Sequence, residues 1–386
     1  MTALGVAPSD LAQRARRIGE GIAGPAADDV DRQARFPTET IGALKSEGIL
    51  GALVPPELGG WGSSLTEAGD TVFAIGLHCA SSAMILAMHH LQVACLARHG
   101  RNHLLRDFQR DVVERQLLLA SATTEAGVGG KLRTSLCAVE RDGDLVSLTK
   151  QAPVISYGAQ ADAVLATARR TAESPPSDQV LVLCRPPGLV LEQMSEWDTL
   201  GFRGTCSPGF MLEAKGPADQ VLSDPFADIA AQTMLPVSHI LWGHVWLGLA
   251  ASALARARSY VQGEARKQPG VAPPGALRLA EAMTLYQQMA SLVHGAAERY
   301  DQRPAGEPVG MGDSVALNSL KVGASSLVID IVSRSLAICG MAGYREGSPY
   351  SLGRHLRDAH GAALMVNNDR ILGDNAQMLL VYKEHP

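Results

Sequence analysis

A glycine-rich segment is the part of the chain whose residue types are best suited to chemistry. It spans Thr123–Gly130, reads TTEAGVGG, and follows shortly after the apolar run Leu117–Leu119. Its glycines leave backbone N–H groups uncovered, and the neighbouring threonine hydroxyls add hydrogen-bond donors. Such a segment can bind an anion or a flat, electron-rich group, although an ordinary glycine-rich turn has the same composition.

This segment lies between two long regions with helical patterns. Residues 10–115 show apolar positions with a period near 3.6, interrupted by a proline- and glycine-rich break at residues 54–62. From about residue 116 the pattern changes to short β-like runs without helices between them, which favours an antiparallel sheet or small barrel. The helical period returns at about residue 225 and continues through three long apolar segments and a final helix near Ser351.

The order of these patterns predicts a mostly α-helical protein with a central β-domain. We expect an N-terminal helical domain over residues 1–115, an antiparallel β-barrel over 116–222 and a C-terminal four-helix bundle over 223–386. A chain of 386 residues is long enough for two or three such units.

Composition and charge narrow the class of protein. The net charge is -5 and no basic stripe appears, which argues against a nucleic-acid partner. No signal-peptide pattern and no run of about 18 apolar residues is found, so we expect a cytoplasmic protein with no membrane partner. The six cysteines never form a CxxC pair, which predicts reduced thiols and no metal site.

Several motifs resemble those of one family, the acyl-CoA dehydrogenases, and they occur in the family's order over essentially the whole chain. The segments that carry the resemblance are a PxxxGGxG-like turn at residues 55–62, a TEPGAGS-like loop at 124–130, a TNGxxAD-like segment at 156–162, a second barrel motif at 197–205 and an RxxRD motif at 354–358.

The resemblance implies a flavin cofactor, FAD with FMN as a possibility, and a homo-oligomer, either a dimer or a tetramer. Thr124 would meet the pyrimidine edge of the flavin ring, and Ser156 takes the place of a threonine near the reactive nitrogen. Small or hydroxyl-bearing residues suit this role because they let the ring lie flat and donate to its polar atoms. The cofactor-binding residues implied are Thr123, Thr124, Gly129, Gly130, Ser156, Gly340 and Gly343, the last two contacting the cofactor of a neighbouring subunit.

The chain departs from the family pattern at the catalytic positions. The family's carboxylate base commonly lies eight residues after the aspartate of RxxRD, where this chain has Val366. The other family location, the stretch around His239, has no carboxylate either. Asp369 and His360 are the candidate catalytic replacements, because a carboxylate or a near-neutral histidine can move protons.

The histidines on the long helices have the same potential, and a structural role is the alternative for each. His239 and His244 lie in the first bundle helix, and His89 and His90 lie in an apolar N-terminal helix that would flank the substrate cavity.

Two cofactor-binding features of the family are also missing. A tryptophan that often covers the flavin is replaced near Val154, and the RxxFG motif that holds the cofactor's pyrophosphate is absent from residues 262–275.

These features leave three hypotheses. The first is a flavin-dependent dehydrogenase that acts on an acyl thioester, carried by CoA or a carrier protein, with a non-standard base and an electron-transfer flavoprotein as electron acceptor. The second is a two-component monooxygenase on the same fold, supplied by a flavin reductase and acting on another small molecule. The third is a catalytically degenerate binding protein.

Overall fold

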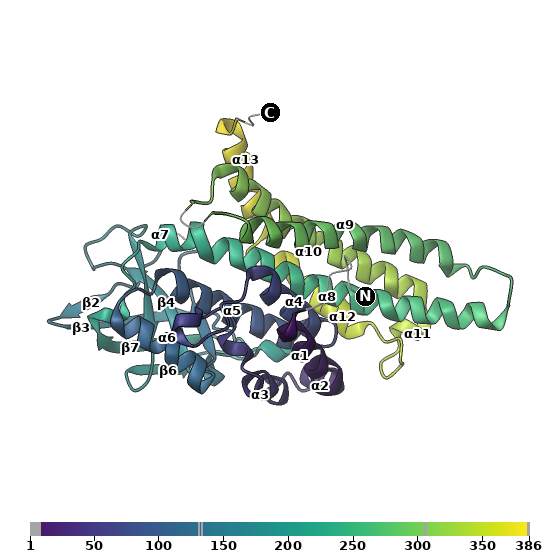
Figure 1. The fold of residues 1–386 in the computed structure, drawn as a ribbon, viewed down its shortest axis with the longest axis horizontal. Coiled ribbons are helices and arrows are strands. Elements are labelled where there is room, and N and C mark those ends of the chain that lie inside the picture. Colours follow the sequence, from purple (N-terminus) through teal and green to yellow (C-terminus); the bar gives the residue numbers. More distant parts are fainter. Residues whose placement is uncertain (1–8, 130–131, 133, 305–306, 384–386) are drawn as a thin grey trace.

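The computed structural model describes residues 9–129, 132, 134–304 and 307–383. A helical N-terminal part, a small β region and a long helical C-terminal part follow one another along the chain (Figure 1). The change from helix to strand falls between Arg115 and Leu119, and helices resume at Phe226.

The N-terminal part packs around one buried helix, α5 (Ala80–His99), which is apolar on nearly all sides. The helix α4 (Leu65–Gly76) precedes it and starts with a capping box in which Ser64 and Glu67 satisfy each other's backbone N–H groups. The other described α-helices of this part are α1 (Asp10–Ile18), α2 (Gly24–Arg32), α3 (Thr38–Ser46) and α6 (His103–Arg115).

The β region contains two open sheets among the described residues. In the first, β4 (Ala163–Arg169) lies between β1 (Leu119–Ala122) and β5 (Gln179–Cys184), and β1 pairs with β4 in parallel. The second is antiparallel in the order β2-β3-β7-β6, with β2 at Glu140–Asp142, β3 at Leu145–Ala152, β7 at Phe210–Pro217 and β6 at Leu189–Gln193.

The predicted antiparallel barrel is therefore not confirmed, whereas the small β region between helical parts is. The two sheets do not close on each other, and one of the pairings is parallel. Strands β4 and β5 are buried along almost their whole length, and β3 alternates between buried and more exposed positions. Continuous apolar runs of this kind are typical of strands covered on both faces, and the sequence pattern alone does not separate such a strand from one in a barrel.

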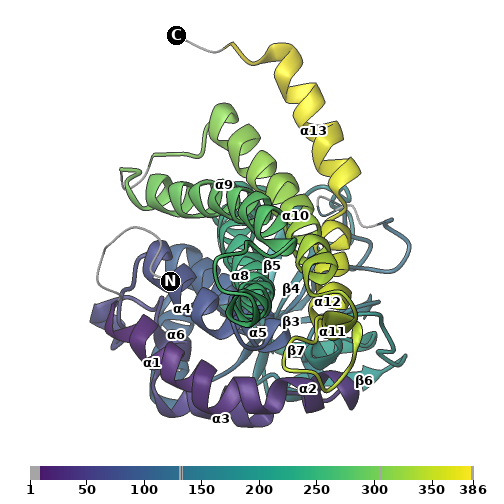
Figure 2. The same cartoon turned by 90° about the vertical axis from the view of Figure 1, so that its right-hand side faces the viewer.

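The C-terminal part is built on the helix α8 (Leu235–Lys267), which runs beside α9 (Gly275–Asp301) and α10 (Met311–Cys339) (Figures 1 and 2). The fourth helix, α12 (Gly353–Leu364), packs on α10 and α8. The short helices α7 (Phe226–Ile229) and α11 (Met341–Tyr344) precede α8 and α12.

The last helix, α13 (Asn368–Val381), packs along the first half of α10, where Asn318 donates to the side chain of Asn375 at 2.8 Å, and its end projects from the body of the molecule (Figure 2). The chain turns sharply between α12 and α13 at Val366, whose φ is 46°. Exposed apolar residues lie on this projecting helix, namely Leu372, Leu379, Leu380 and Val381.

Three helical stretches are long and apolar enough to cross a bilayer by length and composition, those of α5, α8 and α10. Within the fold, the apolar windows of the first two are 89% and 94% buried by the rest of the protein, and that of α10 is 44% buried. The apolar character of α5 and α8 is thus accounted for by packing inside the protein.

Candidate functional site

The glycine-rich loop leaves β1 and forms an open edge of the β region. Thr124 is exposed, and its hydroxyl donates a hydrogen bond to the carbonyl of Val154 at 3.0 Å. Gly127 and Gly129 have φ values of 85° and 61°, a conformation that favours glycine. A Cβ on Gly129 would have no heavy atom within 4 Å, so this side of the loop is free to meet a ligand. Gly130 lies outside the described residues.

Glu125 anchors the loop from inside the protein. Its carboxylate accepts hydrogen bonds from the hydroxyl of Ser135 at 2.7 Å and the backbone N–H of Cys137 at 2.6 Å, and it lies 3.3 Å from the ammonium of buried Lys150. Burial by itself raises the pKa of Glu125, but the hydrogen bond from Ser135 and the charge of Lys150 outweigh it, so the pKa is lowered overall. The carboxylate thus holds the loop in place as a buried anion.

Ser156 lies at the same end of the β region as Thr124. Its hydroxyl oxygen accepts a hydrogen bond from the Ser207 hydroxyl at 2.9 Å, and Val154, the acceptor for Thr124, is two residues away. The next residue, Tyr157, is fully buried and donates its phenol hydrogen to the carbonyl of Leu119 in β1 at 2.9 Å. Thr124 is thus hydrogen-bonded to the segment that contains Ser156, and the flavin role of both hydroxyls stays a prediction.

Gly340 and Gly343 lie elsewhere in the same chain. They flank the junction of α10 and α11, at the end of the bundle remote from the strands (Figure 1). Gly340 has a φ of 55°, and a Cβ on Gly343 would lie 2.7 Å from the Cβ of Cys339, so both positions require glycine for local reasons. They do not join the Thr124 loop within one chain.

The RxxRD motif attaches α12 to the rest of the protein. Asp358 is fully buried and accepts a hydrogen bond from the backbone N–H of Phe202 at 2.6 Å, and its burial raises its pKa to about 6. Arg354 forms an ion pair with Asp28 at 3.1 Å, and Arg357 pairs with Asp31, both on α2. These residues position the last bundle helix against the β region and the N-terminal helices.

Lys321 is the functional candidate that sequence analysis missed. It is fully buried on α10 and donates hydrogen bonds to the carbonyl of Val366 at 2.8 Å and to the side-chain oxygen of Asn368 at 2.7 Å. Burial lowers its pKa to about 8. A lone lysine within the long apolar stretch of α10 was the available signal. Its ammonium contacts the backbone of Val366, the residue at which the resemblance predicts the family's carboxylate.

Polar ring nitrogens gather beside Lys321 on one face of α8. The Nε2 of His239 and the indole nitrogens of Trp242 and Trp246 are buried, and none has a hydrogen-bond partner within the described chain. The ring centroids are 6.3 Å apart for His239 and Trp242 and 6.5 Å apart for the two indoles, and the Lys321 ammonium lies 5.9 Å from the Trp246 ring. The indole nitrogens are donors and His239 Nε2 is an acceptor, because Nδ1 of that ring donates to the Leu317 carbonyl. Buried polar atoms without partners are costly, which favours a bound polar group at this face.

Burial lowers the pKa of each of four histidines on α5 and α8, so that they are neutral at pH 7: His89, His90, His239 and His244. Burial, together with the charge of Lys321, lowers the pKa of His239 to about 4, and burial lowers that of His244 to about 3. The ring of His89 bridges one backbone carbonyl and one backbone N–H. Its Nε2 lies 2.8 Å from the carbonyl of Leu50, and its Nδ1 accepts from the N–H of Leu119 at 3.1 Å. His89 thus fixes β1, whereas both ring nitrogens of buried His90 have no partner within the described residues.

The two predicted catalytic residues lie on the surface. Asp369 is exposed in the first turn of α13, where its backbone N–H donates to the side chain of Asn367 at 2.8 Å. His360 is exposed on α12. Neither belongs to the buried group around Lys321, so their assignment as catalytic residues stays a prediction.

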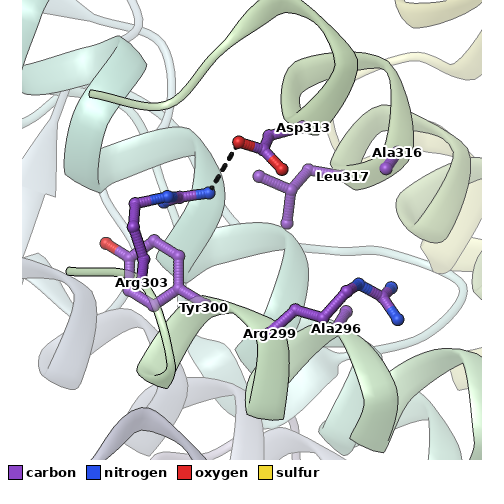
Figure 3. Close-up of a pocket in the computed structure, with 7 residues that line it drawn as sticks. All are labelled: Ala296, Arg299, Tyr300, Arg303, Asp313, Ala316 and Leu317. Carbon is purple, nitrogen blue, oxygen red and sulfur yellow. Dashed lines mark ion pairs between the residues drawn. The ribbon is translucent and has the colours of Figure 1, made fainter. Parts of the chain in front are cut away.

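A small hollow lies between α9 and α10, and it does not serve as a cofactor site (Figure 3). Arg303 and Asp313 form an ion pair of 3.1 Å across it. Its volume of about 20 Å³ is close to that of one water molecule and far below that of a flavin ring.

The Thr124 loop fits a flavin on three observations. Its glycines have the left-handed backbone that favours glycine, its outer side is open at Gly129, and the Thr124 hydroxyl bonds to Val154, two residues before Ser156. Helix α5 contacts β1 and packs on α8, and so connects this loop to the α8 nitrogens that have no partner among the described residues. Fold and site together define a flavoprotein scaffold of helices, β region and helical bundle.

Comparison with protein-family models identifies the family. The model of the acyl-CoA dehydrogenase N-terminal domain matches residues 9–115, and that of the acyl-CoA dehydrogenase C-terminal domain matches residues 229–366. Together they cover more than half of the chain, which therefore belongs to the acyl-CoA dehydrogenase family, a family of FAD-binding, flavin-dependent oxidoreductases.

The similar proteins include both dehydrogenases and a monooxygenase. The chain is 25% identical to the mitochondrial short-chain specific acyl-CoA dehydrogenase of Bos taurus, over 90% of this chain and 84% of the relative. Butyryl-CoA dehydrogenase from Megasphaera elsdenii superposes with a TM-score of 0.83 at 22% identity, covering 98% of this chain and 100% of the other. The dibenzothiophene monooxygenase TdsC from Paenibacillus sp. A11-2 also gives 0.83, at 19% identity and coverages of 97% and 98%.

Proposed function

We propose that the protein oxidises an acyl thioester with a flavin, and that Lys321 replaces the missing carboxylate as the proton acceptor. The observation that carries this proposal is the hydrogen bond of 2.8 Å between the Lys321 ammonium and the carbonyl of Val366. This hydrogen bond places a buried amine next to Val366, the residue that stands where the resemblance predicts a carboxylate. The amino-acid sequence resembles those of acyl-CoA dehydrogenases over 90% of its length, which supports the thioester as substrate class.

Thioester oxidation removes a proton from the α-carbon and a hydride from the β-carbon. A bound flavin supplies the hydride acceptor. The neutral amine of Lys321 takes the α-proton and becomes an ammonium, which the Val366 carbonyl and the Asn368 side chain then stabilise. A lysine whose pKa is lowered to about 8 has enough neutral amine for this role at mildly alkaline pH. Exposed Asp369 and His360 offer no comparable buried position.

The flavin itself would be bound by the Thr124 loop. Thr123, Thr124, Gly129 and Ser156 would meet the ring, and Gly340 and Gly343 would serve the cofactor of a second subunit, since they lie at the far end of the bundle. This arrangement requires a homo-oligomer, a dimer or a tetramer. It also requires an electron acceptor such as an electron-transfer flavoprotein.

The decisive experiment uses the absorption spectrum of the purified protein loaded with FAD. Acyl-CoAs of increasing chain length are added under nitrogen, and we expect the flavin absorption to bleach with at least one of them. A protein that retains FAD but does not bleach with any chain length would contradict the dehydrogenase. A protein that takes up neither FAD nor FMN would instead support the non-catalytic binding protein.

A two-component monooxygenase is the second candidate. It is favoured by the absence of a carboxylate at Val366 and at His239, the two chain positions that supply the base of dehydrogenases in this family. The likeness to TdsC in fold is compatible with it. It predicts turnover only with a flavin reductase, oxygen and an aromatic or amine substrate, and no bleaching by thioesters.

A further inference from the structure

A second group of potential ligand atoms lies where the bundle meets the N-terminal helices. Asp70 is on α4, His244 on α8 and His294 on α9, and one ligand atom from each lies within 4.8 Å of the others. His244 is fully buried, and the other two side chains are half-buried. The three residues are far apart in the chain, so no local sequence motif indicates that they lie together. The sequence prediction of no metal site considered only the spacing of cysteines.

The hydrogen bonding of His244 determines what its ring offers to this group. Nδ1 lies 2.8 Å from the carbonyl of Ile240, so Nδ1 carries the hydrogen and donates it. A neutral imidazole then has a lone pair on Nε2. That nitrogen is buried and has no hydrogen-bond partner in the described part of the chain. Histidine ligands of metal ions characteristically use their second ring N–H in this way, donating to a backbone carbonyl.

The space for the His244 ring is created by Gly69, the residue before Asp70. A Cβ at this position would lie 2.6 Å from Nε2 and from Cε1 of the His244 ring. The imidazole therefore packs directly on the backbone of α4, beside the residue that supplies the carboxylate. The His294 ring meets the His244 ring edge-on, with centroids 5.4 Å apart and planes at 73°.

We propose that Asp70, His244 and His294 bind one Zn²⁺ ion, with water as the fourth ligand. Two imidazoles and one carboxylate are a ligand set that zinc accepts in tetrahedral sites, and a three-residue set leaves one position for solvent. The half-buried Asp70 and His294 lie on the side from which solvent reaches the ion. Burial raises the pKa of the Asp70 carboxyl, the charges of His294 and Arg16 lower it, and the charge of Glu67 raises it.

The ion would link α4 of the N-terminal part to two helices of the bundle. A ligand that binds only the folded protein stabilises it according to its concentration and affinity. Zinc binding at this site is independent of the proposed thioester chemistry, which uses Lys321 on α10, so either proposal can fail alone.

The test measures metal binding to tag-free, flavin-loaded protein after chelator treatment. Zn²⁺ is titrated by calorimetry, and Co²⁺ serves as a probe because tetrahedral Co²⁺ absorbs visible light beyond the flavin bands. We expect one ion per chain and a higher melting temperature with Zn²⁺. Asp70→Asn and His294→Gln should each weaken binding by more than about 100-fold, because loss of an outer-sphere partner alone costs about 10- to 100-fold. Both residues are half-buried, so these variants are expected to fold.

His103→Gln is the matched control. His103 is exposed and lies 2.7 Å from Asp107, which makes the pair a plausible adventitious metal site on the surface. We expect this variant to bind Zn²⁺ as the wild type does. Absence of stoichiometric binding, or binding that survives in both Asp70→Asn and His294→Gln, would overturn the proposal, as would binding that depends on His103.

Discussion

The Thr124 loop and the surroundings of Lys321 differ in how their polar groups are satisfied. The loop is exposed, its carboxylate is fully hydrogen-bonded inside, and its glycines shape an open edge. Around Lys321 the groups are buried, one amine carries a lowered pKa, and three ring nitrogens on α8 lack partners in the described chain. The two groups lie in different parts of the fold, so the proposed cofactor-binding loop and the proposed proton acceptor can be altered separately.

The largest effect is expected for Lys321→Met, which removes the proposed base and leaves the Thr124 loop intact. The rate of flavin reduction by a thioester should fall by about 10²- to 10⁴-fold, the usual contribution of a general base. FAD content should not change. Stopped-flow absorbance under nitrogen measures the rate, and Lys267→Met is the control because exposed Lys267 only pairs with Glu264.

The same rate also depends on pH in a direction that identifies the base. In the wild type it should rise as the pH increases through about 8, because only the neutral amine accepts a proton. A profile that is flat between pH 7 and 9, with unchanged activity of Lys321→Met, would transfer the role of base to another residue.

Glu125→Ala tests the loop side of the comparison. It leaves buried Lys150 without its counter-charge and removes the acceptor of Ser135 and Cys137, so we expect a loss of about 3–5 kcal/mol in stability together with loss of FAD. Ser135→Ala removes only one of these hydrogen bonds and should cost about 1 kcal/mol. Chemical denaturation and the FAD-to-protein ratio give both values, and equal effects of the two variants would refute the anchoring role.

Acid sensitivity should reveal the histidine that fixes β1. Burial lowers the pKa of His89 to about 4, so between pH 6.5 and 4 the unfolded chain binds more protons than the folded one. The contribution of His89 is complete above pH 6.5 and falls by about 2 kcal/mol at pH 5. In His89→Gln the melting temperature should depend less on pH over this range. An unchanged slope would show that other groups cause the acid sensitivity.

The smallest effects are expected from the loop hydroxyls. Thr124→Val and Ser156→Ala should each weaken FAD binding by about 0.5–1.5 kcal/mol, the net value of one hydrogen bond. Fluorescence titration of the flavin measures the affinity. Thr149→Val on β3, a strand that the sequence does not connect with the flavin, is the comparison, and equal losses in all three variants would point to a general effect on the β region.

Sequence patterns predicted the helical parts and the Thr124 loop because these depend on local order. The capping box at Ser64, the left-handed glycines and the RxxRD motif can be read within a few residues. The open sheets were not predicted, since β1 pairs with β4 across about forty intervening residues and buried runs hide their pairing. Lys321 was missed for the same reason, because its partner Val366 lies in another helix–helix junction.

The hydrogen bond from the Phe202 amide to Asp358 affects how relatives of this protein should be classified. Its aspartate belongs to the RxxRD motif of residues 354–358, and it fastens α12 to the loop at Phe202. Replacing this aspartate would remove one attachment of α12, whatever reaction the protein performs. When relatives are sorted by the reaction that they catalyse, the residues at the positions of Lys321 and Val366 are more informative than the RxxRD motif.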